Sequence, residues 1–335
     1  MEKQAVTIYT VAREARVSMA TVSRVVNGNP NVKPETRDKV MAVIKKLHYR
    51  PNAVARGLAS KKTTTVGVVI PEITNSYYAQ LAQGIDDIAT MYKYNILLAN
   101  ANVSGEKPIQ VVRGLFAKQV DGMIYMGQDV SEELAKEFRN STIPVVVAGS
   151  VTNDPELPTV RINFKEATKE AIEKLASQTN GTVGMMVGNN ETTIYHDHWL
   201  AGYKEAMQEQ GKSFSEDLVY VAHNSYDEAY KMADAVIRSG MKGIFVTDDE
   251  MAAGLLNGLT DKGVEVPADF AIISGNDTKE TLMTRPMLST VTQPMYDVGA
   301  VSMRLLTKLM DNDEDVSEQK EILLDHGFIK RQSTR

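Results

Sequence analysis

Basic side chains, rather than nucleophiles, carry most of the chemistry that this sequence offers. The chain contains no cysteine, which excludes thiolate catalysis, disulfides and zinc–thiolate sites and suits a reducing compartment. Arg24 is the one lysine or arginine in residues 17–32, and a lone guanidinium there could hydrogen-bond both acceptors of a guanine. Arg304 and Lys308 are four residues apart, so on one helix face they could together hold a dianionic phosphate. On spacing alone, a solvated surface pair is the commoner meaning of that pattern.

A catalytic role finds little support in the remaining residues. His196 and His198 flank Asp197, the one arrangement that would suggest a metal or acid–base site, and a solvent-exposed loop is the simpler interpretation. There is no Walker A sequence and no Gly-x-Gly-x-x-Gly after a predicted strand. We therefore expect no enzyme, no catalytic residue, no metal and no resident cofactor. An assay for product released from nucleotide sugars or phosphosugars would test the enzyme alternative.

Charge is distributed unevenly along the chain. The net charge is −6, yet residues 1–62 hold 13 Lys and Arg against 4 Asp and Glu, a net of +9, which leaves −15 for the rest. A basic head attracts phosphates while an acidic body repels them. This asymmetry predicts nucleic-acid binding at the N-terminal end, with a solvated basic helical face as the alternative.

Neither a signal peptide nor a membrane span is predicted. Glu14 and helix-forming residues lie where the apolar core of a signal peptide would be. No apolar run approaches the roughly 20 residues that cross a bilayer. We therefore expect a cytoplasmic protein, and the basic head and missing signal argue against a periplasmic binding protein.

Three short helices are predicted in the basic head. Thr7 can cap the first, Ser18 can cap the second, and the third spans 34–47, before the stop at Tyr49-Arg50-Pro51. Apolar residues at helical spacing form a small shared core: Val11, Ala12, Ala15, Val17, Val22 and Val25 or Val26. This is the spacing of a helix-turn-helix, whose second helix would expose Met19, Ala20, Ser23 and Arg24 to the major groove. A structural helical hairpin is the alternative.

From Val66 onward, apolar β-rich runs alternate with amphipathic helices. Such runs predict parallel strands that are buried on both faces, and they lie at residues 66–71, 95–100, 121–126, 144–148, 182–187, 243–247 and 270–274. So many βα units predict two doubly wound lobes with a ligand cleft between them. Residues 289–294 and 322–328 have the pattern of strands that return between the lobes.

Residues 7–27 and 49–58 resemble the LacI/GalR family of bacterial repressors, and the resemblance continues to the end of the sequence. It implies an α/β protein with a three-helix head, a hinge helix and a two-lobed core like that of periplasmic binding proteins, acting as a dimer on palindromic operators. The implied divisions are residues 1–50 for the head, 51–62 for the hinge and linker, 63–161 with 291–321 for the N-terminal lobe, and 162–290 with 322–335 for the C-terminal lobe.

The same resemblance implies how DNA is contacted. Hinge helices of that family fold on DNA and pair in the minor groove, where a leucine wedges open the central base step, and Leu58 matches that leucine. A free segment of about nine residues does not sustain a helix in water. The implied DNA contacts are Thr7, Ser18, Met19, Ala20, Thr21, Ser23, Arg24, Asn27, Asn52, Ala55 and Leu58.

Two positions of the head depart from the family pattern. Thr10 stands where aspartate is usual, so the first helix lacks a negative charge near its N-terminus. Arg16 occupies a turn position where glycine is usual, which implies a mildly strained turn or one more phosphate contact.

The expected effector cleft departs from the family as well. Sugar-binding members use an arginine three residues before a Gly-aromatic pair and an aspartate on a late strand. Trp199 and Asn276 stand at those places here, with Asp277 as an alternative one residue along. Without the guanidinium fork and the carboxylate, bidentate recognition of sugar hydroxyls is lost. Asp248 points toward the cleft by resemblance, or merely caps a helix.

Within the family, residues 89–95 and 293–310 closely resemble regulators of carbon catabolite repression in low-GC Gram-positive bacteria. The resemblance implies serine-phosphorylated HPr as corepressor, with its phosphoserine held by Arg304 and Lys308 and with Tyr296 and Asp297 in the same interface. Sugar phosphates are the implied adjunct effectors. A sugar-responsive repressor of the same family is the alternative, and titration with sugars against the phosphoprotein would separate the two.

Overall fold

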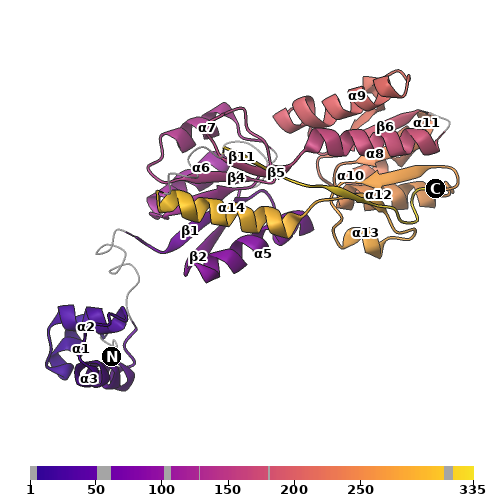
Figure 1. The fold of residues 1–335 in the computed structure, drawn as a ribbon. Helices are drawn as coiled ribbons and strands as arrows, with labels where there is room; N and C mark the ends of the chain where they lie inside the picture. Colours follow the sequence, from indigo (N-terminus) through magenta and orange to yellow (C-terminus); the bar gives the residue numbers. More distant parts are fainter. Residues whose placement is uncertain (1–5, 51–61, 102–106, 128, 180–181, 313–319) are drawn as a thin grey trace. The chain divides into compact units, whose positions relative to one another are not determined.

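The computed structural model describes residues 6–50, 62–101, 107–127, 129–179, 182–312 and 320–335. The chain divides into two compact units, residues 1–63 and 64–335. The first unit contains the N-terminal helices, and the second contains the strands (Figure 1). Among the described residues, no helix is both long enough and apolar enough to cross a membrane.

The first unit is built from the helices α1 (Ile8–Ala15), α2 (Met19–Val26) and α3 (Pro34–Leu47). The predicted starts of α1 and α2 are confirmed: the hydroxyls of Thr7 and Ser18 accept hydrogen bonds from the backbone N–H of Thr10 and Thr21, respectively. Proline occupies the first position of α3, where its missing N–H costs nothing. Val11, Ala15, Val22 and Val40 are fully buried and form the small core.

Both family departures have structural counterparts in the head. The hydroxyl of Thr10 accepts a hydrogen bond from the N–H of Thr7 at 3.4 Å, which completes a reciprocal cap without a carboxylate. Arg16 ends α1 with φ 51° and ψ 47°, the left-handed conformation that favours glycine. The strained turn expected there is therefore present.

In the part of the chain that the structure describes, the second unit contains two six-stranded sheets. The first sheet has the order β11-β5-β4-β3-β1-β2 and only parallel pairs among the described residues, such as Val66 beside both Ile96 and Gly122. Its strands are β1 (Thr65–Ile70), β2 (Asn95–Asn100), β3 (Gly122–Tyr125), β4 (Val145–Ala148), β5 (Thr159–Ile162) and β11 (Glu321–Leu324). Its helices are α5 (Ser76–Met91), α6 (Lys107–Ala117), α7 (Glu132–Arg139) and α14 (Met295–Met310).

The second sheet repeats this order as β12-β10-β9-β8-β6-β7, with an antiparallel pair formed by β10 and β12. Its strands are β6 (Val183–Val187), β7 (Val219–Val221), β8 (Gly243–Val246), β9 (Ala271–Ser274), β10 (Ser289–Thr292) and β12 (Gly327–Ile329). Its helices are α8 (Phe164–Gln178), α9 (Leu200–Glu209), α10 (Tyr226–Lys231), α11 (Ala233–Arg238), α12 (Asp249–Asp261) and α13 (Glu280–Met283), with a π-helix η1 (Ile194–Trp199) and a 3-10 turn η2 (Glu216–Leu218).

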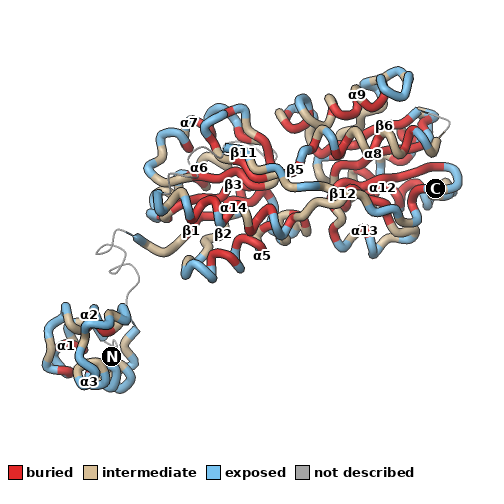
Figure 2. Tube along the Cα trace, viewed as in Figure 1, coloured by how far each residue is buried: buried red, intermediate tan, exposed pale blue. Residues whose placement is uncertain are grey.

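Helices cover both faces of each sheet, which explains the continuous apolar strands (Figure 2). Val68 packs with α5 and α14, whereas its neighbour Val69 packs with α6 and α7. In the second sheet Met185 contacts the α8–α9 layer, and Met186 contacts the layer of α10, α11 and α12. The expected pair of doubly wound sheets is confirmed.

The returning segments cross between the sheets later than predicted. Residues 291–292 belong to β10 of the second sheet, and residues 322–324 pair with β5 in the first sheet. The crossings therefore fall at residues 293–294 and 325–326, not at 291 and 322. An apolar run marks a strand, but only its distant partner decides which sheet it joins. The short strands β5 and β7 were also absent from the prediction.

Candidate functional site

The outer face of α2 presents the side chains that the sequence assigned to DNA. Met19 is 41% exposed, and Ala20 and Arg24 are also exposed, while Thr21 and Ser23 are half-buried. The Ser18 and Thr21 hydroxyls lie 2.9 Å apart at the start of the helix.

The neighbouring predicted contacts are also placed on the head surface. The Asn27 amide donates to the Ser23 hydroxyl at 3.4 Å, and Thr7 is exposed at the cap of α1. The outer face of α2 thus exposes both polar side chains and the apolar Met19 and Ala20. The predicted hinge contacts Asn52, Ala55 and Leu58 lie outside the described residues.

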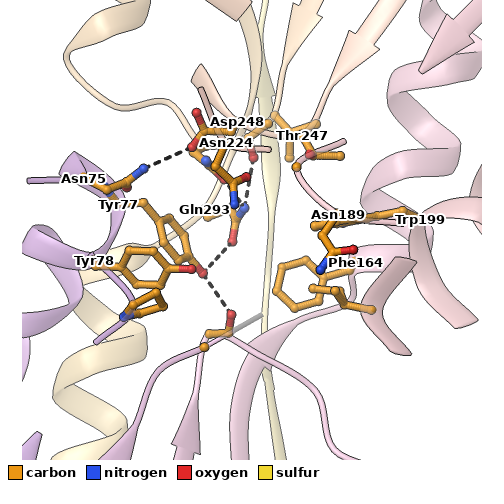
Figure 3. A pocket seen from close by; sticks show the side chains of 18 of the residues that line it. Asn75, Tyr77, Tyr78, Phe164, Asn189, Trp199, Asn224, Thr247, Asp248 and Gln293 are labelled. Atoms are coloured by element: carbon orange, nitrogen blue, oxygen red, sulfur yellow. Dashed lines mark hydrogen bonds between the residues drawn. The ribbon is translucent and has the colours of Figure 1, made fainter. Parts of the chain in front are cut away.

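A cavity of about 550 Å³ lies between the two sheets (Figure 3). Gly127 and Gly149 line it within two residues of the ends of β3 and β4, and Gly188 and Gly275 directly follow β6 and β9. The carboxyl ends of strands from both sheets therefore meet at the cavity, which is where doubly wound folds bind ligands.

The three residues expected in the cleft, Trp199, Asp248 and Asn276, all line this cavity. Asp277 does not, because its carboxylate accepts a hydrogen bond from the Arg331 guanidinium at 2.6 Å. Asn276 is therefore the late-strand residue that reaches the cavity.

Asp248 has both of the roles considered for it. One carboxylate oxygen caps α12 by accepting from the N–H of Glu250 and Met251 at 2.9 and 3.2 Å. The other accepts from the Asn75 side-chain amide at 3.3 Å (Figure 3). Burial raises the pKa of Asp248, and the bonds to these N–H groups oppose that rise only in part.

Asp249, the next residue, faces away from the cavity into the protein. Its carboxylate accepts from the N–H and the hydroxyl of Thr278, both at 2.7 Å, and from the N–H of Asn276 at 3.2 Å. Burial raises its pKa to about 6. Asp249 thus fixes the loop that carries Asn276.

Several residues that line the cavity were not predicted from the sequence. Gln293 lies in the crossing after β10, and its amide donates to the Gly275 carbonyl at 2.9 Å and to Asn276 at 2.7 Å. Tyr77 is buried, and its hydroxyl donates to the Gly149 carbonyl at 3.3 Å. The positions of Asn75, Tyr77 and Tyr78 shortly beyond a predicted parallel strand were the signal that could have found this side of the cavity.

The prediction of a loop around His196 is wrong, because the structure has a helix there. Residues 194–199 form the π-helix η1, in which His196 and Asp197 are exposed and His198 is half-buried. Burial lowers the pKa of His198 and favours its neutral form. Within the described ranges, no group of three or more His, Asp and Glu side chains could hold a metal ion.

A third surface lies on α14. Val298 and Leu305 are buried, whereas Asp297, Arg304 and Lys308 are exposed, as the helical spacing predicts. Tyr296 is 42% exposed, and its hydroxyl donates to the Asp87 carboxylate of α5 at 2.9 Å.

Helices α5 and α14 lie side by side because small residues let their backbones approach (Figure 1). A Cβ atom added to Gly84 would lie 2.1 Å from the Tyr296 carbonyl oxygen, and one added to Gly299 would lie 2.0 Å from that of Leu81. This close approach fixes the position of the exposed α14 face.

The helix-turn-helix head and the two-lobed core define a class of protein. Residues 7–52 match the family model "Bacterial regulatory proteins, lacI family", and residues 181–334 match "Periplasmic binding protein-like domain". The chain belongs to the lacI family and is a DNA-binding transcription regulator.

Its curated relatives share nearly the whole length. Catabolite control protein A of Streptococcus mutans is 52% identical over 330 residues, 98% of each chain. The HTH-type transcriptional regulator pepR1 of Lactobacillus delbrueckii subsp. lactis is 47% identical over 100% of this chain and 99% of its own. These relatives are regulators, not enzymes.

Solved structures agree with these matches. The transcription regulator CcpA of Lactococcus lactis has a TM-score of 0.77 and 40% identity, over 81% of this chain and 99% of its own. The lac repressor dimer bound to operator has a TM-score of 0.87 and 25% identity, over 99% of each chain.

Proposed function

We propose that this regulator binds palindromic operators as a homodimer and represses genes of carbon catabolism in the cytoplasm, with its operator affinity raised by serine-phosphorylated HPr. The single observation that carries the corepressor assignment is the exposed pair Arg304 and Lys308 on one face of α14. The likeness to catabolite control protein A over the full chain supports the same assignment.

DNA binding follows from the exposed face of α2. In the proposed complex α2 enters the major groove, Arg24 reads a guanine, and polar residues around the helix contact phosphates and base edges. Asn52, Ala55 and Leu58 of each hinge would contact the minor groove, where Leu58 wedges a base step. The fold match to a lac repressor dimer bound to operator supports this arrangement.

The α14 surface suits a phosphoserine for two physical reasons. A guanidinium fork and an ammonium one helical turn apart can bind three phosphate oxygens by charge-assisted hydrogen bonds. In the part of the chain that the structure describes, neither Arg304 nor Lys308 pairs with a carboxylate, so both cations remain available. Tyr296, held by Asp87, and Asp297 extend the polar surface next to them.

The decisive experiment replaces the two cations with alanine. Arg304→Ala and Lys308→Ala should each weaken binding of serine-phosphorylated HPr about tenfold or more, since a charge-assisted bond contributes about 1.5–3 kcal/mol. Operator binding without the phosphoprotein should remain nearly unchanged, whereas its stimulation should fall with the lost affinity. Calorimetry with phosphorylated and unphosphorylated HPr measures the first effect, and operator titration measures the second.

Arg238→Ala and Lys231→Ala provide the matched control, because both residues are exposed cations on the second lobe. The control pair should bind the phosphoprotein like the unchanged chain. Undiminished affinity of the Arg304 and Lys308 variants would mean that this pair is a solvated face and that HPr docks elsewhere.

A small-molecule effector is the second candidate, and the cavity between the sheets is the observation that favours it. Operator affinity measured with candidate sugars, and separately with the phosphoprotein, distinguishes the two signals. A response to sugars alone would favour this candidate.

A further inference from the structure

The cavity between the sheets has an unusual charge for a site expected to receive sugar phosphates. Among the described residues that line it are three carboxylates, those of Glu72, Glu191 and Asp248, and no lysine or arginine. The imidazole of His223 is the only titratable nitrogen in this described lining. A phosphate group would therefore enter a negative field with no lysine or arginine to neutralise it.

Side-chain caps reduce what the helix N-termini at the cavity can offer an anion. Helix N-termini attract anions through free N–H groups, and here side chains already accept hydrogen bonds from some of these groups. Asn75 caps α5 by accepting from Tyr77 N–H at 2.9 Å, Asn163 caps α8 by accepting from Glu166 N–H at 3.2 Å, and Asp248 caps α12. The first turn of α12 adds two further acidic residues, Asp249 and Glu250.

Asp248 is the most informative of the three carboxylates. Its partners are two backbone N–H groups and the Asn75 amide, all of them uncharged. Asp248 is half-buried, so its carboxylate has lost part of its hydration, and a cation brought by a ligand would offset that loss. The pKa of the half-buried Tyr78 hydroxyl is raised first by desolvation, then by Tyr77 and then by Asp248, so the two side chains lie within electrostatic reach of each other.

Aromatic rings complete the site. Tyr78, Asn75 and Asp248 lie on one side of the cavity, and Phe164 and Trp199 lie on the other (Figure 3). A cation is attracted both by carboxylates and by the faces of aromatic rings, and the rings also stack with a flat or cyclic body.

We propose that this cavity binds a small cationic ligand, an amine-bearing polar molecule whose ammonium group lies beside Asp248, and that it excludes phosphorylated sugars. Phosphate groups would then be bound by other parts of the molecule, namely the exposed face of α14 and the DNA-binding head. The proposal is independent of the phosphoprotein surface, because neither Arg304 nor Lys308 lines the cavity.

The local field can be measured without knowing the ligand. Trp199 is the only tryptophan in the chain and lines the cavity, so its fluorescence reports on that site alone. Quenching by caesium and by iodide would be measured at about pH 7.5, where carboxylates are ordinarily ionised, each relative to quenching of N-acetyltryptophanamide. Caesium should quench Trp199 more efficiently than iodide, and Asp248→Asn should reduce the difference.

The variants are chosen so that the fold is preserved. Asparagine caps a helix as well as aspartate does, so Asp248→Asn removes the charge and keeps the cap of α12. Asp217→Asn is the matched control, since Asp217 is exposed and does not line the cavity. It should leave the ratio of caesium to iodide quenching unchanged.

Selectivity is tested with three sugars that share the same ring but differ in charge. Glucosamine is a cation, glucose is neutral and glucose 6-phosphate is an anion. Titrations followed by Trp199 fluorescence should give glucosamine the lowest Kd, about tenfold or more below that of glucose 6-phosphate. Asp248→Asn should bring the Kd of glucosamine close to that of glucose. Stronger quenching by iodide than by caesium, or failure of glucosamine to bind more tightly than both other sugars, would overturn the proposal.

Discussion

The close approach of α5 and α14 makes Gly84→Ala a sensitive probe of the first lobe. The added Cβ would lie 2.1 Å from the Tyr296 carbonyl oxygen, well inside the 3.0 Å that Cβ atoms keep from other heavy atoms, so the helices must separate by about 1 Å. Overpacking of this kind costs about 1–3 kcal/mol. Replacing a helical glycine with alanine returns about 0.5–1 kcal/mol. We therefore expect a net loss of about 1–2 kcal/mol in the free energy of unfolding.

Urea denaturation followed by far-UV circular dichroism measures this loss as a lower midpoint. Gly114→Ala is the internal control, because Gly114 lies in α6 and nothing lies within 4 Å of its added Cβ. The same chemical change should stabilise the protein there by about 0.5–1 kcal/mol. If Gly84→Ala left the midpoint unchanged or raised it, the argument that these helices pack backbone against backbone would fail.

Three further predictions concern single residues. Arg24→Ala should weaken specific operator binding by about 1–3 kcal/mol, and an equal loss on random DNA in salt titrations would reduce Arg24 to a phosphate contact. Arg16→Gly should stabilise the head by about 1 kcal/mol by relieving its left-handed backbone, and an unchanged or lower melting temperature of the head would contradict this. Because burial raises the pKa of Asp249 to about 6, its contribution to stability is present at low pH and is lost as pH rises through 6. Unfolding of Asp249→Asn should lack that part of the pH dependence, and identical profiles would refute the assignment.

Most of the fold could be predicted because the strands are unusually apolar. The sequences of β1, β4 and β8 are buried throughout, or nearly so, and a continuous apolar run identifies such strands without alignment. β5 was not predicted because Arg161 interrupts its apolar run, and β7 was not predicted because it has only three residues. The sheet that β11 joins depends on its pairing with β5, which lies about 160 positions earlier in the chain, and no local pattern encodes that pairing.

The candidate sites were predictable to different degrees. The exposed stripe of α14 follows directly from helical periodicity, since Val298 and Leu305 fix which face is buried. The cavity required the resemblance, which located Trp199, Asp248 and Asn276 but not their neighbours. Gln293 was missed because its amide acquires a role only when the crossing after β10 brings it beside Asn276, and that depends on tertiary structure.

The crossings between the sheets also bear on how the protein is made. β11 and β12 follow the other strands of both sheets in sequence, and each completes one edge of a different sheet. Neither lobe can therefore acquire its full set of strands on the ribosome until the last residues of β11 and β12 have been synthesised, at positions 324 and 329. The head has its own core within residues 8–49 and can fold as soon as it emerges. During synthesis the DNA-binding head is thus expected to fold before the regulatory core. The two lobes of the core are then expected to be completed almost together.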